Sequence, residues 1–348
     1  ILDGSASSAD LRSVELDDLL GRDPVNLDWE AMGQMIQNRR VLITGGAGSI
    51  GSELCRQVAR LEPEEITLFE QNEFSLYSLA MELEEQFPDV QFRRLLGDVC
   101  DPEAVQFVFS QYRPEVVFHA AAYKHVPMLQ AQLRETIRNN TVGTMVAARA
   151  AVESGVEKFI LISTDKAVNP TSMMGVSKRI AEMVAQFNNA KSTTAFITVR
   201  FGNVLGSAGS VVPLFERQIR GGGPVTVTDP MMTRYFMTIS EACQLILQAC
   251  AIGRGGEIFV LNMGEPVKID YLARQMIRLS GKVPDEEIKI RYTGLRPGEK
   301  LTEELFHPDE DLAPTSYEKI LLAQSRSLDE THFESELHML RESVERYD

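Results

Sequence analysis

The chain has 348 residues, a hydrophobic content of 44% and a formal net charge of -15. This length allows one large α/β core and a smaller lobe. The negative charge argues against a nucleic-acid partner, because such binding depends on Lys and Arg at phosphates. No apolar run approaches the roughly 18–20 residues that span a bilayer, and the start shows no signal-peptide pattern. Because the first residue is Ile1 rather than Met, we expect a fragment of a longer protein.

The four cysteines predict neither a metal site nor a disulfide framework. Cys55, Cys100, Cys243 and Cys250 lack the spacing of zinc ligands and the density of a disulfide-stapled fold. We therefore expect reduced thiols and no bound metal.

Apolar and amphipathic segments alternate after an acidic lead-in at residues 1–38, which holds no phosphate loop and no catalytic cluster. Strands are predicted at 40–44, 65–69, 90–96, 115–119, 157–163 and 194–200. Helices are predicted at 49–61, 72–86, 101–112, 130–153 and 172–190. Near-continuous apolar strands that are separated by amphipathic helices predict a doubly wound parallel α/β sheet of the Rossmann type.

The pattern loosens beyond Asn203, where glycines and prolines interrupt it repeatedly. We therefore divide the rest of the chain into three parts. Residues 39–203 form the dinucleotide-binding domain with the catalytic residues, 204–310 form most of a smaller α/β substrate lobe, and 311–348 form a C-terminal extension.

A glycine-rich segment joins the first strand to the first helix. Gly45 permits the tight turn, Gly48 lets the backbone approach a pyrophosphate, and Gly51 allows close packing of helix on strand. The phosphates are expected at Ser49 and Ile50, where the free N–H groups of a helix N-terminus favour negative charge. A glycine motif alone is a weak signal, but the strand before it and the helix after it supply the required context.

The residues that follow the next strands complete the predicted cofactor site. Glu70 closes the second strand, where a carboxylate can accept hydrogen bonds from both ribose hydroxyls. The residues at 71–73 include no Arg or Lys for a 2′-phosphate, which favours NAD over NADP. The other predicted cofactor contacts are Asp98 and Val99 at the adenine, Ala120, Ala121 and Ala122 at the backbone of the cofactor, and Asn140 near the active site.

The segment at 163–178 has the arrangement of a short-chain dehydrogenase/reductase active site with one difference. Lys178 is the lysine of the usual Tyr-x-x-x-Lys pair, but Met174 stands where the tyrosine is expected. Upstream, Thr164, Asp165 and Lys166 put an acid and an amine side by side. A nicotinamide site with this additional pair is equipped for more than hydride transfer.

Together these motifs resemble the extended short-chain dehydrogenase/reductases. The shared segments are Thr44–Gly51, Asp98, His119–Tyr123, Asn140–Thr144, Ser163–Lys178 and Arg200–Asn203. Other segments are similar to the UDP-N-acetylglucosamine 4,6-dehydratases of bacterial polysaccharide biosynthesis, namely Thr164–Lys166, Ala122–Pro127, Gly206–Pro213, Met232–Thr238 and Arg296–Lys300. The resemblance covers the chain from residue 11 to about residue 310.

The resemblance extends to one branch of these dehydratases. Long members carry N-terminal membrane helices ahead of a cytoplasmic catalytic domain, and Met174 matches that configuration-retaining branch, whereas the C5-inverting relatives keep a tyrosine. The resemblance therefore implies a cytoplasmic catalytic domain of a bacterial inner-membrane protein. Contact with the membrane would be made only through a segment absent from this chain.

The implied reaction is an internal redox cycle on UDP-N-acetylglucosamine. NAD takes hydride from carbon 4, the ketone acidifies carbon 5, water leaves across carbons 5 and 6, and the hydride returns to carbon 6. We assign Lys166 as the base and Asp165 as the acid. Lys178 holds the nicotinamide ribose and Thr164 bonds the 4-oxygen. Asp165, Lys166 and a water stay open as acceptors of the 4-hydroxyl proton, and Met174 either fills the core or shapes the pocket.

The resemblance also implies where the UDP-sugar binds. Arginine suits diphosphate oxygens because its planar donors match their geometry. The predicted contacts to UDP are Asn203, Ser210, Val211, Arg234, Arg296 and Glu299, and those to the sugar are Lys124 and His125.

Two other functions share many of these features. A UDP-sugar 4-epimerase would use the same fold, NAD and a UDP lobe, but it needs no acid/base pair for water loss and usually relies on the tyrosine. A non-catalytic NAD-binding subunit or sensor would fit the loss of the tyrosine, but Asp165, Lys166 and Lys178 count against it. We expect a homo-oligomer, a dimer or larger, that pairs through the helices at 130–153 and 172–190.

Overall fold

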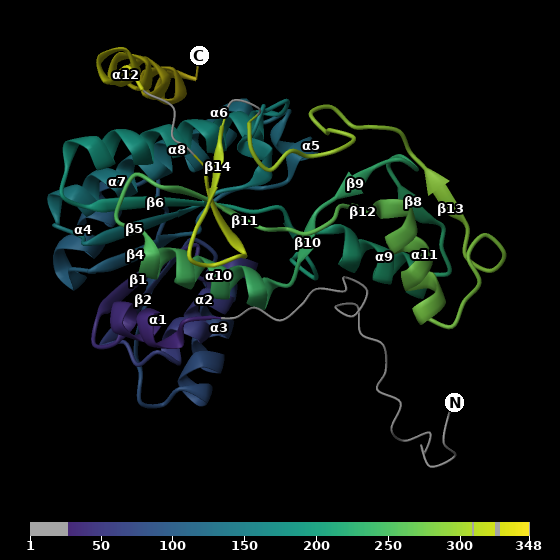
Figure 1. Ribbon diagram of the computed structural model, residues 1–348, viewed down its shortest axis with the longest axis horizontal. Coiled ribbons are helices and arrows are strands. Elements are labelled where there is room, and N and C mark those ends of the chain that lie inside the picture. Colours follow the sequence, from purple (N-terminus) through teal and green to yellow (C-terminus); the bar gives the residue numbers. More distant parts are fainter. Residues whose placement is uncertain (1–26, 308–309, 324–327, 348) are drawn as a thin grey trace.

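A nine-stranded sheet forms the centre of the larger part of the molecule in the computed structural model, which describes residues 27–307, 310–323 and 328–347 (Figure 1). Its strands are β1 (Arg40–Thr44), β2 (Glu65–Glu70), β3 (Gln91–Leu96), β4 (Val116–His119), β5 (Lys158–Ile162), β6 (Ala195–Arg200), β11 (Ile258–Leu261), β14 (Leu312–Pro314) and β15 (Ile320–Ala323). The order is β14-β15-β11-β6-β5-β4-β1-β2-β3. Each pair of neighbouring strands from β11 to β3 is parallel. Strand β15 is antiparallel to both of its neighbours, β11 and β14.

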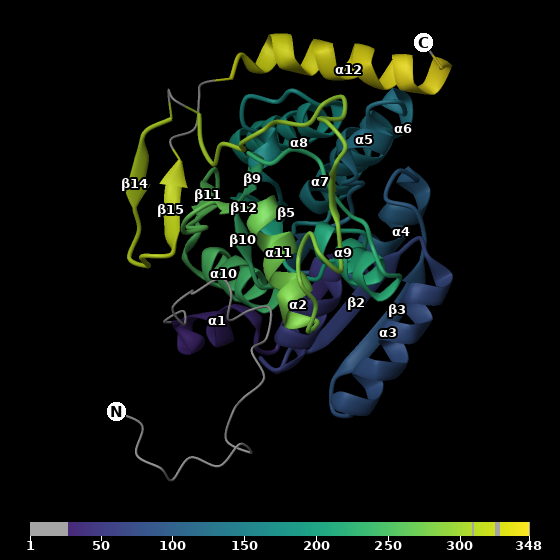
Figure 2. The ribbon, with the colours of Figure 1, turned by 90° about the vertical axis from the view of Figure 1, so that its right-hand side faces the viewer.

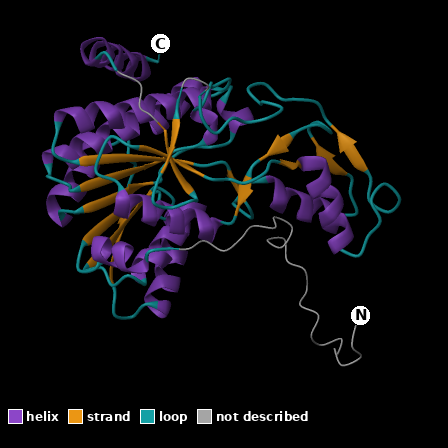
Figure 3. Cartoon of the chain, viewed as in Figure 1, coloured by secondary structure: helices purple, strands orange, loops and turns teal. Residues whose placement is uncertain are grey.

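Helices cover both faces of this sheet (Figure 3). One apolar core lies between the sheet and α1 (Trp29–Ile36), α2 (Ser49–Ala59), α3 (Glu73–Gln86) and α10 (Ile239–Ile252). The second core lies on the other face, under α4 (Pro102–Tyr112), α7 (Gly143–Glu153) and α8 (Met173–Lys191). The predicted doubly wound α/β fold is confirmed. The strand order reverses between β1 and β4, the point at which such sheets bind ligands.

The six predicted strands agree with the structure to within one residue at each end. Five of them are buried on both faces and almost continuously apolar, whereas β3, at the edge of the sheet, is largely exposed. The single helix predicted at 130–153 is wrong. After the short α5 (Val126–Leu129), that region contains α6 (Leu133–Ile137), a π-helical turn at Arg138–Val142 and then α7. The wider turn leaves an apolar pattern much like that of a continuous α-helix, so hydrophobic periodicity does not reveal it.

A smaller lobe lies beside the sheet, at the right of Figure 1. It contains α9 (Val211–Arg220), α11 (Ile269–Leu279) and the paired strands β8 (Val225–Val227) and β13 (Ile290–Tyr292), which share an apolar core. Two further short pairs connect it to the rest: β7 (Asn203–Val204) with β10 (Phe236–Met237), and β9 (Thr233–Arg234) with β12 (Val267–Lys268).

The predicted division at residues 204 and 311 needs correction. Helix α10 and strand β11, both within 204–310, pack on and pair with the large sheet rather than with the smaller lobe. Strands β14 and β15 extend the same sheet, so most of the described part of 311–348 also belongs to the larger body. Sequence order misled here because the chain crosses between the two bodies more than once.

Both ends of the described chain pack against the larger body. The lead-in predicted at 1–38 falls mostly outside the described residues, but α1 is part of the core: Asp28 caps it, and the Asp28 N–H donates to Gln248 of α10 at 2.8 Å. Helix α12 (Glu330–Arg346) lies across the face formed by α7 and α8 (Figure 2), where the Phe333 and Phe187 rings are 5.8 Å apart. The homo-oligomer expected to pair through this face stays a prediction.

Candidate active site

The turn between β1 and α2 has no room for side chains at its glycines. Gly45 has φ of 64°, and a Cβ placed there would lie 2.7 Å from the backbone of Ala121. A Cβ on Gly51 would lie 2.1 Å from the Gly45 carbonyl oxygen, so α2 can approach the turn only without one. Helix α2 begins at Ser49 with Gly48 as its N-cap. The open helix N-terminus and the bare backbone fit a pyrophosphate.

A groove of about 180 Å³ lies at this turn. The predicted cofactor residues that line it are Gly45, Gly48, Glu70, Val99, Ala120, Ala121 and Ala122. Phe69, Gln71, Tyr123 and Asn139, which were not predicted as cofactor contacts, line it as well. Gly97, which precedes Asp98 and Val99 in the segment predicted at the adenine, is also part of the lining. A Cβ on Gly97 would lie 2.4 Å from the Phe69 ring, so glycine is needed where the two strand ends meet.

Two predicted acids hold backbone around the groove. Glu70 Oε1 accepts hydrogen bonds from the N–H groups of Gln71 and Asn72 at 2.9 and 3.0 Å, and its Oε2 accepts from Ala47 at 3.3 Å. Asp98 accepts from the Cys100 N–H and pairs with Arg138 at 2.8 Å. Glu70 therefore orders the glycine turn from within the groove, while Asp98 fixes the π-helical turn beside it.

The π-helical turn positions Asn140 between two functional segments. Its Oδ1 accepts from the Tyr123 N–H at 2.8 Å, and its Nδ2 donates to the Tyr123 carbonyl and to Ser177 Oγ, both at 3.0 Å. Asn140 is fully buried. It therefore ties the loop after β4 to α8 immediately next to Lys178.

Helix α8 presents Lys178 and Met174 to the interior. Both side chains are buried, at 4% and 3% exposure. Burial lowers the pKa of Lys178 to about 8, although nearby Glu182 opposes the shift. An amine with a pKa this close to neutrality can exchange a proton during a reaction. Met174 brings no titratable group to the position where related enzymes have a tyrosine.

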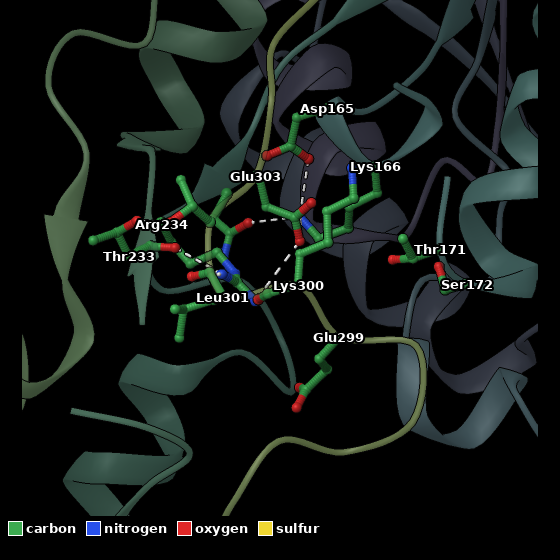
Figure 4. Close-up of polar contacts among 12 residues, drawn as sticks. Asp165, Lys166, Thr171, Ser172, Thr233, Arg234, Glu299, Lys300, Leu301 and Glu303 are labelled. Atoms are coloured by element: carbon green, nitrogen blue, oxygen red, sulfur yellow. Dashed lines mark hydrogen bonds and ion pairs between the residues drawn. The ribbon is translucent and has the colours of Figure 1, made fainter. Parts of the chain in front are cut away.

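Strand β5 ends at Ile162, and the chain then turns into a short 3₁₀ helix at Asp165–Ala167. The turn brings the side chains of two consecutive residues, Asp165 and Lys166, into contact with each other. Lys166 Nζ lies 2.9 Å from Asp165 Oδ1 and 3.0 Å from Asn203 Oδ1. The Thr164 hydroxyl donates to the same Asp165 oxygen at 2.9 Å. Figure 4 shows Asp165 and Lys166 together at the entrance to the substrate lobe.

A pocket of about 480 Å³ opens in front of Lys166. All eight residues predicted to bind the UDP-sugar line it: Lys124, His125, Asn203, Ser210, Val211, Arg234, Arg296 and Glu299. Other lining residues that sequence reasoning missed include Thr226, Thr228, Met232, Thr293, Lys300 and Glu303. The structure thus brings together residues that are far apart in the sequence, from Lys124 to Glu303.

The two predicted diphosphate arginines differ in their surroundings. Arg234 is 7% exposed and donates to the carbonyls of Thr233, Lys300 and Leu301 at 2.7–3.1 Å. Arg296 is more exposed and pairs with Glu299 at 2.6 Å. Arg234 therefore organises the wall of the pocket, whereas Arg296 has donors available at its mouth.

His125 and Lys124 also line this pocket. A Cβ on Gly209 would lie 2.6 Å from the His125 ring, so the imidazole rests directly on this glycine. Burial, and then the charge of Lys124, lower the pKa of His125, while burial lowers the pKa of Lys124. Burial therefore shifts both groups toward their neutral forms, relative to the same groups in water.

Over the described ranges, no group of three or more His, Cys, Asp or Glu side chains has a geometry that could hold a metal ion. Over the same ranges, no helix combines the length and apolar character needed to cross a bilayer.

Comparison with known proteins shows the family. Residues 41–325 match the family model described as "Polysaccharide biosynthesis protein". The chain belongs to this family. It is 52% identical over 322 residues to the capsular polysaccharide biosynthesis protein CapD of Staphylococcus aureus, covering 92% of this chain and 54% of CapD. The chain therefore spans about half the length of this relative.

Solved structures agree with the family assignment. Pen from Bacillus thuringiensis aligns with a TM-score of 0.77 and 33% identity, covering 84% of this chain and 90% of Pen. DesIV of Streptomyces venezuelae, titled dTDP-glucose 4,6-dehydratase with NAD and TYD bound, aligns with a TM-score of 0.68 and 23% identity, covering 76% and 88%. The second likeness concerns the fold alone. In the family fold described here, the glycine turn and the Lys166 pocket lie at the ends of the parallel strands.

Proposed function

We propose that this member of the family is an NAD-dependent UDP-N-acetylglucosamine 4,6-dehydratase. The observation that carries the proposal is the position of Lys166. Its amine lines a pocket that also contains the residues suited to a UDP-sugar, and it is hydrogen-bonded to an acid on the adjoining turn. An amine–carboxyl pair facing a sugar pocket is suited to eliminating water next to a ketone.

NAD is the cofactor that fits the groove. When bound, it would accept hydride from carbon 4 and return it to carbon 6. Gly48 and the N-terminus of α2 would hold its pyrophosphate, and Glu70 its ribose. Lys178, buried and with a lowered pKa, would bind near the nicotinamide ribose and favour loss of the 4-hydroxyl proton.

The UDP moiety is placed by the N-terminus of α9 and the mouth of the pocket. Ser210 is the N-cap of α9, and its hydroxyl has no hydrogen-bond partner among the described residues. Helix N-termini favour phosphate, and Arg296 lines the same pocket with donors that match diphosphate oxygens. The sugar would then extend inward toward Lys166.

Within the pocket, Lys166 is the base that removes the proton from carbon 5 once carbon 4 is a ketone. Asp165 and Asn203 hold the amine in place from two sides. Departure of the 6-hydroxyl also needs a proton donor, and the sequence-based expectation assigns this role to Asp165.

The test is to incubate the protein with UDP-N-acetylglucosamine and NAD and to follow the sugar by NMR. A new 6-methyl signal with a 4-keto carbon is the expected result. A galacto-configured sugar would instead identify a 4-epimerase, and unchanged substrate would favour a non-catalytic NAD-binding protein. Lys166→Met, assayed in parallel, shows whether any product depends on this amine.

A further inference from the structure

Glu303 is a carboxyl group in the active-site pocket that was not among the predicted site residues. It is 5% exposed and lines the pocket with Lys166. Its Oε1 lies 3.9 Å from Lys166 Nζ and 3.7 Å from Arg234 Nη2. Figure 4 shows Glu303 beside the Asp165–Lys166 pair, on the side of Arg234. Its carboxyl is therefore near the proposed base and on the wall that faces the substrate.

Several polar contacts hold Glu303 there through the strap segment, defined here as residues 296–304. Arg234 donates to the Lys300 and Leu301 carbonyls. Lys300 Nζ in turn donates to the Val168 carbonyl at 3.1 Å, directly after the catalytic turn. The strap segment is thus fastened both to the substrate lobe and to the turn that carries Lys166, which fixes Glu303 between them.

Asp165, unlike Glu303, does not line the pocket. Its side chain is fully buried, and its Oδ1 already accepts from Thr164 and Lys166. Its Oδ2 faces Gly202, where a Cβ would lie 3.2 Å away. Asp165 is thus placed to hold and orient Lys166, with protein rather than the pocket around it.

The carboxyl groups that line the pocket, among the described residues, are Glu299 and Glu303. Glu299 is bound to Arg296 at 2.6 Å, and although burial opposes the effect, this contact lowers the pKa of Glu299. Glu299 is therefore held as a carboxylate at the mouth of the pocket. Glu303 is the deeper of the two relative to Lys166, which it approaches to 3.9 Å.

We propose that Glu303, rather than Asp165, is the general acid that protonates the departing 6-hydroxyl, an assignment that rests on the proposed dehydratase function. Asp165 is then a positioning residue that acts through Lys166. The 3.9 Å between Lys166 Nζ and Glu303 Oε1 is consistent with these roles. The base must reach the proton on carbon 5 while the acid reaches the oxygen on carbon 6, so the two groups must be close but separate.

The elimination balances with these two groups. The carbon-5 proton moves to Lys166 Nζ, and the electron pair of that C–H bond forms the carbon-5/carbon-6 double bond. The carbon-6–oxygen bond breaks as the carboxyl proton of Glu303 moves to the leaving oxygen, so water departs. After hydride addition at carbon 6 from the nicotinamide, the Lys166 ammonium returns a proton to carbon 5. Glu303 regains its proton from the one released by the 4-hydroxyl.

The electrostatic surroundings favour the protonated form of the Glu303 carboxyl more than water does. Burial is the largest influence and raises the pKa of Glu303. The charge of Asp165 raises it further, while the charges of Lys166, Arg234 and Lys300 lower it without cancelling the effect. General acids work best when their pKa lies near the operating pH.

The test compares Glu303→Gln and Asp165→Asn on two substrates. One is UDP-N-acetylglucosamine, and the other is its 6-deoxy-6-fluoro analogue, whose fluoride leaves without a proton from a general acid. Glu304→Gln is the matched control, because Glu304 lies on the same strap segment but is exposed and contacts Asn169 and Lys300. NAD content and thermal unfolding are measured for each variant to confirm folding.

We expect Glu303→Gln to lower the dehydration rate of the natural substrate by about 100-fold or more, the range of a positioned acid, while NADH still forms on the enzyme. On the fluoro analogue the same variant should stay within about fivefold of wild type, because no acid is needed. Asp165→Asn should be slow on both substrates, since it disturbs Lys166. Glu304→Gln should resemble wild type on both.

Three results would overturn this assignment while leaving the proposed function intact. The first is a Glu303→Gln variant with a wild-type rate on the natural substrate. The second is a Glu303→Gln variant that is equally slow on both substrates. The third is an Asp165→Asn variant, rather than Glu303→Gln, whose rate returns to that of wild type on the fluoro analogue. Wild-type protein that forms no 6-deoxy product from either substrate would instead overturn the proposed function and the assignment together.

Discussion

Arg200 and Glu182 form a bidentate ion pair in the interior of the protein, with Nε–Oε1 and Nη2–Oε2 both at 2.7 Å and neither side chain exposed. The pair joins β6 to α8 directly behind the catalytic turn. The Ser163 hydroxyl also donates to Glu182 Oε1 at 2.7 Å, and Arg200 reaches Glu310 at 2.8 Å. The pair therefore connects the strand ends that carry the active site to the C-terminal part of the sheet.

Removing one partner of this pair should be strongly destabilising. Glu182→Gln removes the bidentate partner of the buried Arg200 guanidinium, which keeps its contact with Glu310, and breaking such a buried pair costs about 3–5 kcal/mol of unfolding free energy. Urea unfolding at pH 7 measures the change. Glu153→Gln is the control, because its partner Arg149 is exposed and surface pairs contribute no more than about 1 kcal/mol. Equal effects of the two substitutions would show that the buried pair is not a structural anchor.

The same pair predicts a loss of stability in acid. Burial alone would raise the pKa of Glu182, but the charges of Arg200 and Arg179 and the hydrogen bonds from Arg200 and Ser163 outweigh it and lower the pKa to about 2. Because the folded pKa is below that of the unfolded chain, this stabilisation is present above about pH 4.5 and is lost as the pH falls toward 2. The difference in unfolding free energy between wild type and Glu182→Gln should therefore shrink across this window. A difference that stays constant would contradict the prediction.

Lys178 should destabilise the protein near neutral pH. Its pKa falls from 10.5 in the unfolded chain to about 8 in the folded state, so the folded state releases the proton first. Stability should therefore rise with pH between 8 and 10.5, by on the order of 3 kcal/mol in total. Lys178→Met removes this dependence. Its advantage in unfolding free energy over wild type should be largest at or below pH 8 and decrease toward pH 10, and the opposite trend would show that the amine is not buried as described.

Glu70→Ala should weaken NAD binding by about tenfold or more, the value of a lost hydrogen bond to a charged group. The carboxylate lines the cofactor groove and also orders the glycine turn through Ala47. Fluorescence titration with NAD measures the affinity, and Glu73→Ala, at the first residue of α3, is the control. Recovery of mainly NADP from the purified wild-type protein would refute the cofactor preference.

Lys166→Met should separate the two halves of the reaction. Carbon-4 oxidation stays available because the cofactor groove and Lys178 are intact, so NADH absorbance should appear on the enzyme without 6-deoxy product. Substrate recovered from deuterated water should show no exchange at carbon 5. Lys191→Met, which removes a surface ion pair with Glu334, is the control. Complete absence of NADH in the Lys166 variant would mean that this amine acts in the first oxidation instead.

Met174→Tyr should give a folded protein whose turnover does not rise. The side chain is buried at 3% exposure, so the larger ring is expected to lower stability by about 1–3 kcal/mol through overpacking. Steady-state kinetics on UDP-N-acetylglucosamine provides the measurement. A gain of about tenfold, equivalent to about 1.4 kcal/mol at the transition state, would indicate that the missing tyrosine limits the enzyme.

Much of the fold was predictable because most of its strands are buried on both faces. The apolar runs at Val41–Ile43 and Val116–Phe118 are typical of interior strands, and Gly45 and Gly51 mark the turn between strand and helix, where there is no room for a Cβ. The eight substrate-pocket residues were found through motifs that resemble a known family. Local periodicity alone would not have joined Lys124 to Arg296.

The burial of Glu303 and the π-helical turn depend on tertiary contacts, which local sequence patterns do not reveal. Glu303 and Glu304 are adjacent and chemically identical, yet one is buried beside Lys166 and the other is exposed. The difference arises from two contacts that hold the strap segment in place. Arg234 donates to the Lys300 carbonyl, and Lys300 Nζ donates to the Val168 carbonyl. The π-helical turn at Arg138–Val142 was missed for a similar reason. It positions Asn140 for hydrogen bonds to the Tyr123 backbone, and these are contacts between segments that are distant in the sequence.

The nine-stranded sheet has outer strands that discourage lateral growth into a second molecule. At one side, β3 carries Arg93, which pairs with Glu65 of β2, and Arg94, which pairs with Glu84 of α3. At the other side, β14 is only three residues long and ends in Pro314, which has no N–H to donate. Charged side chains, short length and proline each oppose edge-to-edge association. These features protect both edges of the extended sheet from pairing with a strand of a second molecule.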